Sequence, residues 1–209
     1  MSDRIDRAAR EAFRYESLRP GQREAIESVL GVVRRHGLRA HMDGARLMNA
    51  VVASGVPAAD FASGFDTAWV DFSKGLGAPV GAVMAGSRDL IQEAWRYKQM
   101  MGGALRQAGI VAAGCLYALD HHVERLAEDH ANARRLAAGL EELGLEVQPP
   151  ETNIVICPVE DAPGLTARLA EREVEVSAAG PGRIRMLTHL DVDEAGIERA
   201  LGAFAEALA

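Results

Sequence analysis

A predicted strand, a lysine and a glycine-rich turn follow one another in the sequence Thr67-Ala68-Trp69-Val70-Asp71-Phe72-Ser73-Lys74-Gly75-Leu76-Gly77-Ala78-Pro79-Val80-Gly81. The run from Thr67 to Phe72 is typical of a strand, and the glycines after Lys74 let backbone and ligand approach closely. Burial there would leave Lys74 as a nucleophilic amine that can form an imine with an aldehyde. From spacing alone, an ordinary lysine that reaches the surface from a strand end also fits.

A second polar motif, His41-Met42-Asp43-Gly44-Ala45-Arg46, closes a predicted strand at Leu38 to Met42. Open α/β sheets bind ligands at the carboxyl ends of their parallel strands. Asp43 precedes Lys74 by 31 positions, about one βαβ unit, so both side chains can reach one crevice. Pyridoxal phosphate (PLP) uses a lysine for its Schiff base and an acidic partner for its ring nitrogen. The pair therefore favours a PLP site.

Helical and strand patterns alternate along the rest of the chain. Two helices are expected within residues 2–36, the second ending at Gly37. Strands separated by such crossovers suggest parallel pairing in an α/β fold. Further helices are expected at 47–52, 87–101, 107–143, 164–173 and 193–208, and further strands at 79–84, 145–147, 153–159, 174–177 and 183–190. We predict three parts: a helical segment at 1–31, a larger unit at 32–143 and a small domain at 144–209.

Composition narrows the class of protein. The 209 residues are 48% hydrophobic and 25% charged, which is typical of a globular fold. The net charge of -7 argues against a nucleic-acid-binding role. No apolar run approaches the 18 or so residues that span a membrane, and Cys115 and Cys157 fit small buried thiols in a reducing compartment. We expect a cytoplasmic protein without a metal site.

Four motifs in the chain resemble those of the low-specificity threonine aldolases of the β-eliminating lyase group. The motifs are residues 41–50, 72–81, 102–109 and 185–191, and the resemblance runs from about residue 32 to the C-terminus. It implies part of the fold-type-I architecture of PLP-dependent enzymes, with residues 32–143 in the PLP-binding large domain. It also implies retro-aldol cleavage of L-threonine or L-allo-threonine to glycine and acetaldehyde, by a homo-oligomer.

The resemblance also assigns roles to single residues. It implies that Lys74 forms the Schiff base with PLP and that Asp43 pairs with the pyridine nitrogen. Arg46 would lie near the phenolic oxygen of the cofactor and the substrate carboxylate, which Arg185 would clamp. Arg106 would lie near the cofactor phosphate, before a helix N-terminus that favours anions. Without the resemblance, Arg106 and Arg185 fit surface arginines equally well.

The chain resembles only the later part of this family. The family's N-terminal half supplies a phosphate-binding turn and two histidines, and we find no counterpart of that half here. We expect His121, His122 and His130 to lie on the polar face of the long helix and assign no catalytic base. A sheet that lacks its remaining strands leaves an unpaired edge and uncovered apolar faces. We therefore expect the chain to be only marginally stable in isolation.

Residues 10–31 resemble instead the opening segment of RecQ-family DNA helicases, in which residues matching Arg19 and Gln22 read the nucleotide base. No phosphate-binding G-x-x-x-x-G-K-[ST] loop follows, so ATP hydrolysis is not expected. We interpret the chain as a truncated or rearranged gene product. The alternatives to an aldolase are an inactive remnant that acts as a structural or interaction protein, and a helicase-related nucleotide binder.

Overall fold

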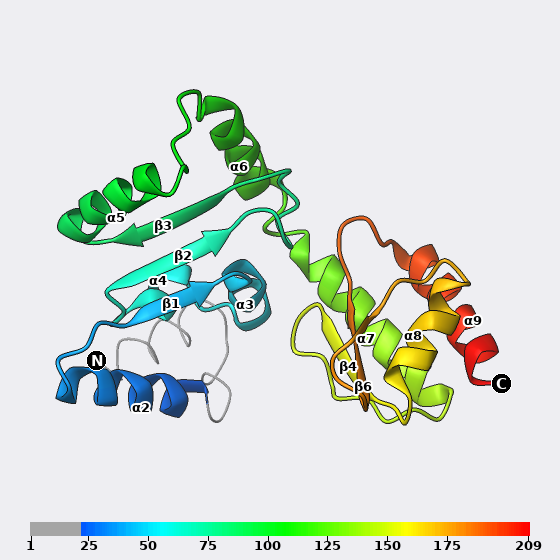
Figure 1. Cartoon of the computed structure of the whole chain (residues 1–209). Coiled ribbons are helices and arrows are strands. Elements are labelled where there is room, and N and C mark those ends of the chain that lie inside the picture. Colours follow the sequence, from blue (N-terminus) through cyan, green and yellow to red (C-terminus); the bar gives the residue numbers. More distant parts are fainter. Residues whose placement is uncertain (1–21) are drawn as a thin grey trace. The chain divides into compact units, whose positions relative to one another are not determined.

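The computed structural model describes residues 22–209, with side chains from residue 25 onward. The first predicted helix and the greater part of the helicase-like segment therefore lie outside the described residues. The chain divides into two compact units between Glu124 and Arg125, which are described one at a time (Figure 1). This boundary differs from the expected one at 143/144, because the helix after residue 125 packs with the C-terminal elements.

The first unit is a small three-stranded sheet with helices before, between and after its strands. Strand β1 pairs in parallel with β2, and β2 pairs antiparallel with β3, in the order β1-β2-β3. Its elements are α2 (Gln22–Arg35), β1 (His41–Gly44), α3 (Leu47–Ser54), α4 (Ala58–Ala62), β2 (Thr67–Asp71), β3 (Ala82–Gly86), α5 (Arg88–Met100) and α6 (Gly109–His121). The parallel pairing expected for the strands that carry Asp43 and Lys74 is confirmed.

Strand β3 corrects the prediction of a further parallel strand at 79–84. It runs antiparallel to β2 and occupies residues 82–86. Parallel neighbours need a crossover of a dozen or more residues, whereas a short loop can join antiparallel ones. The loop between β2 and β3 closes on itself, with the amide of Phe72 donating to the carbonyl of Gly81 at 3.0 Å.

The expected helix over 107–143 is two helices, α6 and α7 (Leu126–Glu142), separated by a turn at residues 122–125. At this turn the amide of His122 makes a helical bond to Ala118, and its side chain is hydrogen-bonded to the loop after β2. The first turn of α7 carries Glu128 and Asp129, whose charges suit the positive end of a new helix dipole. The apolar spacing continues across the break, so the sequence pattern did not reveal it.

The second unit is an antiparallel sheet in the order β4-β6-β5, packed with helices. Besides α7, its elements are β4 (Ile154–Pro158), α8 (Ala162–Ala170), β5 (Ser177–Ala178), β6 (Arg183–Leu187) and α9 (Glu194–Leu208). The strand expected at 145–147 is only a single bridge between Gln148 and Ile156. Asp161 and Asp193 cap α8 and α9 by accepting from the amides of Gly164 and Gly196.

The core of the second unit is continuous, with Leu140, Val155, Ile184 and Phe204 fully buried in one cluster. Cys157 belongs to this cluster, and both cysteines are free and buried, as expected. Burial, with a smaller effect from the charge of Glu146, raises the pKa of the Cys157 thiol above its ordinary value. Cys157 is therefore an inert core residue.

The prediction that His130 lies on a polar helix face is wrong, because its side chain is buried. It neighbours the fully buried Asp129, which pairs with Arg125 at 2.7 Å. The main-chain carbonyl of Asp129 accepts from the hydroxyl of Thr188 at 2.6 Å, and Asn153 Nδ2 donates to the carbonyl of Thr188. This polar network ties α7 to the ends of β4 and β6.

Two negative findings concern the described residues. No helix within residues 22–209 combines the length and the apolar character needed to cross a membrane. In the same part of the chain, no three His, Cys, Asp or Glu side chains converge as metal ligands would.

Candidate active site

Polar side chains gather on one face of the parallel pair β1 and β2. Asp43 is in register with Trp69, and His41 with Thr67, so these four residues project from the same face. A hydrogen bond of 2.8 Å between His41 Nδ1 and Thr67 Oγ1 joins the two strands there. The strands end at Gly44 and Asp71. The carboxyl end of this pair is therefore where a ligand would meet polar groups.

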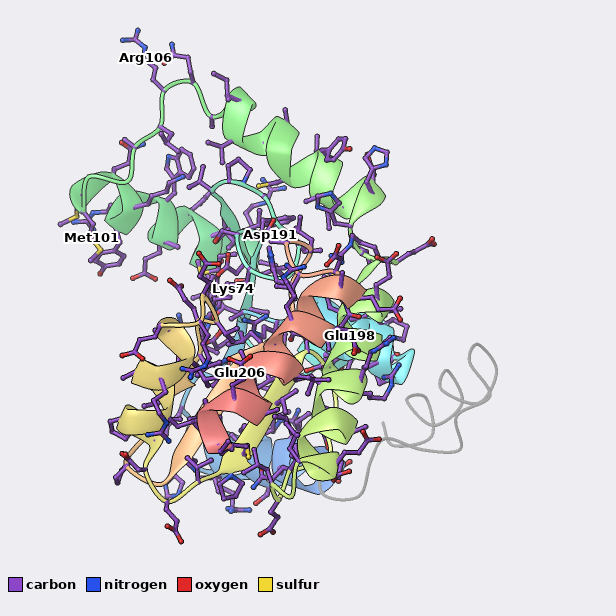
Figure 2. The ribbon with its side chains drawn as sticks, turned by 90° about the vertical axis from the view of Figure 1, so that its right-hand side faces the viewer. Lys74, Met101, Arg106, Asp191, Glu198 and Glu206 are labelled. Atoms are coloured by element: carbon purple, nitrogen blue, oxygen red, sulfur yellow. The ribbon has the colours of Figure 1, made fainter. Side chains whose placement is uncertain are left out.

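Lys74 follows β2 and folds back onto this face. Its Nζ lies 3.3 Å from Asp71 Oδ2 and 5.5 Å from the centre of the Trp69 ring. The lysine side chain is 40% exposed, and that of Asp71 only 10%. The described residues therefore do not desolvate Lys74 as the sequence suggested, but hold its ammonium between a carboxylate and an aromatic ring. Figure 2 labels Lys74 among the side chains.

Asp71 is the residue near Lys74 that sequence reasoning missed. Burial by itself would raise its pKa, but hydrogen bonds from the hydroxyl and amide of Ser73 and the nearby Lys74 outweigh it and lower the pKa below the ordinary value. The Ser73 bonds to Asp71 Oδ1 measure 2.6 and 2.8 Å. The sequence already indicated this position, because side chains two residues apart in a strand lie on the same face, which puts Asp71 on the face of Trp69.

The loop after Lys74 is pinned by its backbone. The amide of Gly77 donates to the carbonyl of Lys74 at 2.9 Å, and the amide of Ala78 donates to Phe72 at 2.8 Å. The side chains of Phe72 and Leu76 are buried and anchor the loop. His122 Nδ1 donates to the carbonyl of Leu76 at 2.6 Å. His122 was expected on a helix face, but it instead fixes the loop that carries Lys74.

Asp43 and Gly44 form the end of β1. Asp43 is exposed, and its Oδ1 accepts from the amide of Ala45 at 3.0 Å. Gly44 is buried, and a Cβ there would collide with the carbonyl oxygen of Trp69. The glycine thus allows β1 and β2 to approach closely beside the Asp43 carboxylate.

The three predicted arginines are placed differently. Arg46 immediately precedes α3 and shares the carboxyl end of the sheet with Asp43 and Lys74. Arg106 is exposed in the loop between α5 and α6, and Figure 2 shows it at the tip of that loop, away from Lys74. Arg185 is half-buried on β6 in the second unit, in register with Ile156. Within the first unit, the structure therefore brings together Asp43, Arg46 and Lys74, but not Arg106.

A family model described as Beta-eliminating lyase matches residues 19–162, which include this sheet and the Lys74 loop. The chain belongs to the beta-eliminating lyase family. The match begins inside the segment at 10–31 that resembles helicases, so the family region starts before the expected residue 32.

Two curated relatives illustrate the likeness. The low specificity L-threonine aldolase of Escherichia coli K12 is 41% identical over 172 residues, which cover 81% of this chain and 51% of that protein. Low-specificity L-threonine aldolase 1 of Arabidopsis thaliana is 35% identical over 193 residues, covering 88% and 54%. The chain thus spans about half the length of these relatives.

The fold is that of known beta-eliminating lyase relatives. The solved threonine aldolase of Leishmania major superimposes with a TM-score of 0.69 at 22% identity, over 88% of this chain and 56% of that one. At this identity the likeness concerns the fold alone. The predicted class, part of the fold-type-I architecture of PLP-dependent enzymes, is confirmed.

Proposed function

We propose that the protein is a PLP-dependent aldehyde-lyase of the threonine aldolase type, which cleaves L-threonine or L-allo-threonine to glycine and acetaldehyde. One observation carries the proposal: Lys74 and Asp43 lie at the carboxyl ends of adjacent parallel strands, on the face that also holds Trp69. The two curated relatives are both named as L-threonine aldolases.

The side chains of Lys74 and Asp43 have the chemistry that PLP requires. Lys74 offers a partly exposed amine for an aldehyde, and Asp43 offers an exposed carboxylate for a ring nitrogen. When bound, PLP supplies an aldehyde that condenses with amines and a ring that accepts electrons from the breaking bond. Both groups lie at the carboxyl end of the same parallel pair of strands.

The other residues of the site would bind the substrate and orient the amine of Lys74. Trp69 and Asp71 hold the Lys74 side chain against the strand end, which places its amine within reach of a ligand over the face. We propose that the guanidinium group of Arg46 holds the substrate carboxylate, for which a planar two-pronged donor is suited. The corresponding role of Arg185 stays a prediction from the sequence. Arg106 lies away from Lys74 (Figure 2), so its role toward the cofactor phosphate stays a prediction from the sequence. Homo-oligomerisation and a cytoplasmic location stay predictions from the sequence.

Reductive trapping tests the proposal. The chain is incubated with PLP, reduced with borohydride and digested, and the modified peptide is identified. Lys74 and Lys98 are the only two lysines in the sequence, so Lys98→Ala is a matched control for Lys74→Ala. Lys98 lies on α5, 4.8 Å from the ring of Trp95. The proposal requires an adduct that Lys74→Ala abolishes and Lys98→Ala leaves intact.

Activity provides the second readout. Glycine and acetaldehyde released from L-threonine in the presence of PLP should fall to background in Lys74→Ala and stay unchanged in Lys98→Ala. Release that is equal in both variants would contradict the role of Lys74.

A further inference from the structure

The second unit contains a cavity of about 330 Å³ beside the edge of its sheet. Residues 173–176 line one side of it, and residues 186–188 line the other. Its floor is apolar, because the buried side chains of Leu136, Ile197 and Phe204 line it. Ligand pockets run from about 300 to 1,000 Å³. The cavity is at the lower end of this range, so it is suited to a small molecule rather than to a long chain.

The cavity opens where strand β5 stops pairing with β6. The ladder ends at the pair Ser177–Arg185. Hydrogen-bonded and non-hydrogen-bonded pairs alternate in an antiparallel ladder, and the bond that the amide of Ala179 donates to β6 at 2.9 Å fixes which positions are bonded. The next bonded pair would be Glu175 with Leu187, but no main-chain bond within the described residues joins these two. Both line the cavity, so a ligand there can make the bonds that the ladder leaves unmade.

Glu173 is the residue at which the chain turns away from the sheet. Its φ of 59° lies in the left-handed region, and no other non-glycine residue in the described part of the chain has a positive φ. The amides of Glu173 and Val174 donate back to carbonyls at the end of α8, at 3.1 and 3.0 Å. This is a helix cap that usually uses glycine. The gap between residues 174–176 and β6 is therefore fixed by the way α8 ends.

Arg199 supplies a guanidinium group to the cavity. Its Nη2 lies 3.7 Å from the position that a Cβ on Gly196 would take, and both residues line the cavity. No ion pair or hydrogen bond from Arg199 is present among residues 22–209. Arg172, the other arginine of the lining, is instead engaged by Glu206 at 3.2 Å. Arg199 is therefore available to bind a carboxylate.

We propose that this cavity is a binding site for a free apolar α-amino acid such as leucine. Arg199 binds the carboxylate, the carbonyls of Glu175 and Leu187 accept from the ammonium, and the side chain packs on the apolar floor. The lining also carries the carboxylates of Glu173, Glu175 and Asp191. These charges disfavour a simple anion, whereas a zwitterion meets both signs.

The cavity shares no residue with the candidate active site. Asp43, Arg46 and Lys74 are not in its lining. Arg185, which the sequence predicts to clamp the substrate carboxylate, leaves β6 on the face opposite to Met186, and Met186 lines the cavity. The proposal is therefore independent of the proposed function.

Calorimetric titration of the full chain with L-leucine, in the absence of PLP, tests the proposal. We expect saturable binding at one site with a dissociation constant below about 1 mM. Two analogues should each bind at least about 10-fold more weakly: 4-methylpentanoate, which lacks the ammonium, and 3-methylbutylamine, which lacks the carboxylate. No binding of leucine up to about 10 mM, or binding of either analogue as tight as that of leucine, would overturn the proposal.

Matched variants locate the site. Arg199→Gln is expected to raise the dissociation constant of leucine at least about 10-fold. Arg96→Gln, which alters an exposed arginine on α5 of the first unit, should bind leucine as the unaltered chain does. Saturating leucine should also slow amide exchange in residues 174–176 and at Leu187 by about five-fold. Equal binding by both variants, or unchanged exchange at these positions, would overturn the proposal.

Lys74→Ala separates this site from the proposed active site. This variant should retain leucine binding, and a loss of binding in it would place leucine beside Lys74 and overturn the proposal. Leucine binding that depends on Arg199, together with no PLP adduct on Lys74, would refute the proposed function only.

Discussion

Lys74 and Asp71 form an ion pair of 3.3 Å at the end of β2, in which the carboxylate is largely buried and the ammonium is 40% exposed. The pair fixes the amine over Trp69 on the face that also carries Asp43. This ion pair has to open before the amine can condense with an aldehyde.

Asp71→Asn is expected to speed the trapping of PLP on Lys74. Partly exposed ion pairs contribute up to about 1 kcal/mol, so we expect an increase of about two- to five-fold. The initial rate of borohydride-trapped adduct at fixed PLP measures it. Asp120→Asn, which alters an exposed carboxylate on α6, serves as control. A slower rate in Asp71→Asn would mean that the carboxylate assists the amine rather than restraining it.

Gly44→Ala is expected to separate β1 from β2, because the new Cβ would collide with the carbonyl oxygen of Trp69 and backbone cannot move aside cheaply. Overpacking of this kind costs about 1–3 kcal/mol, and the adduct yield should fall with it. In Gly202→Ala the added methyl meets open space within α9, so this variant should be as stable or more so. Urea unfolding of both variants checks the contrast. Equal stability would refute the close approach at Gly44.

His122→Ala is expected to loosen the loop after Lys74, because the carbonyl of Leu76 loses its donor. A lost hydrogen bond of this type costs about 1 kcal/mol, so amide exchange in residues 75–78 should accelerate about five-fold. His121→Ala is the matched control, since the exposed His121 stacks only with Tyr117, at 4.3 Å between ring centres. Acceleration in both variants would point to general unfolding of α6 instead.

The second unit should lose stability in mild acid because of His130. Burial, and secondarily the charge of Arg134, lower its pKa below the ordinary value, against the opposing effect of Asp129. The unfolded chain therefore binds a proton at higher pH than the folded one, and the free energy of unfolding falls as pH drops below about 6.5. Amide exchange of α7 and α9 between pH 7.5 and pH 5.5 or so, corrected for intrinsic rates, measures it. His130→Gln should flatten this dependence; an unchanged slope would assign it to other groups.

The spacing of apolar residues predicted the helices and strands well wherever a single spacing continued through the whole element. Helix α9 and strand β6 lie within the expected ranges, and the pairing of the strands before Asp43 and Lys74 followed from their crossover. The antiparallel direction of β3 could not be predicted, because it depends on a loop closed by the Phe72–Gly81 hydrogen bond.

The candidate site could likewise be predicted only in part from the sequence. Motifs identified Asp43 and Lys74, whereas the hydrogen bond from His122 to the loop after Lys74 spans 46 positions. The burial of His130 depends on how α7 packs in the second unit, although its spacing from the buried Leu126 and Ala133 places it on the same helix face. Contacts that join distant segments were therefore the ones that the sequence could not provide.

Peptide-resolved trapping of PLP tests the central claim most directly, because one digest reports both lysines of the chain. The account predicts the reduced adduct on the peptide that carries Lys74, in clear excess over the one that carries Lys98. Equal labelling of the two lysines, or an adduct on Lys98 alone, would contradict it.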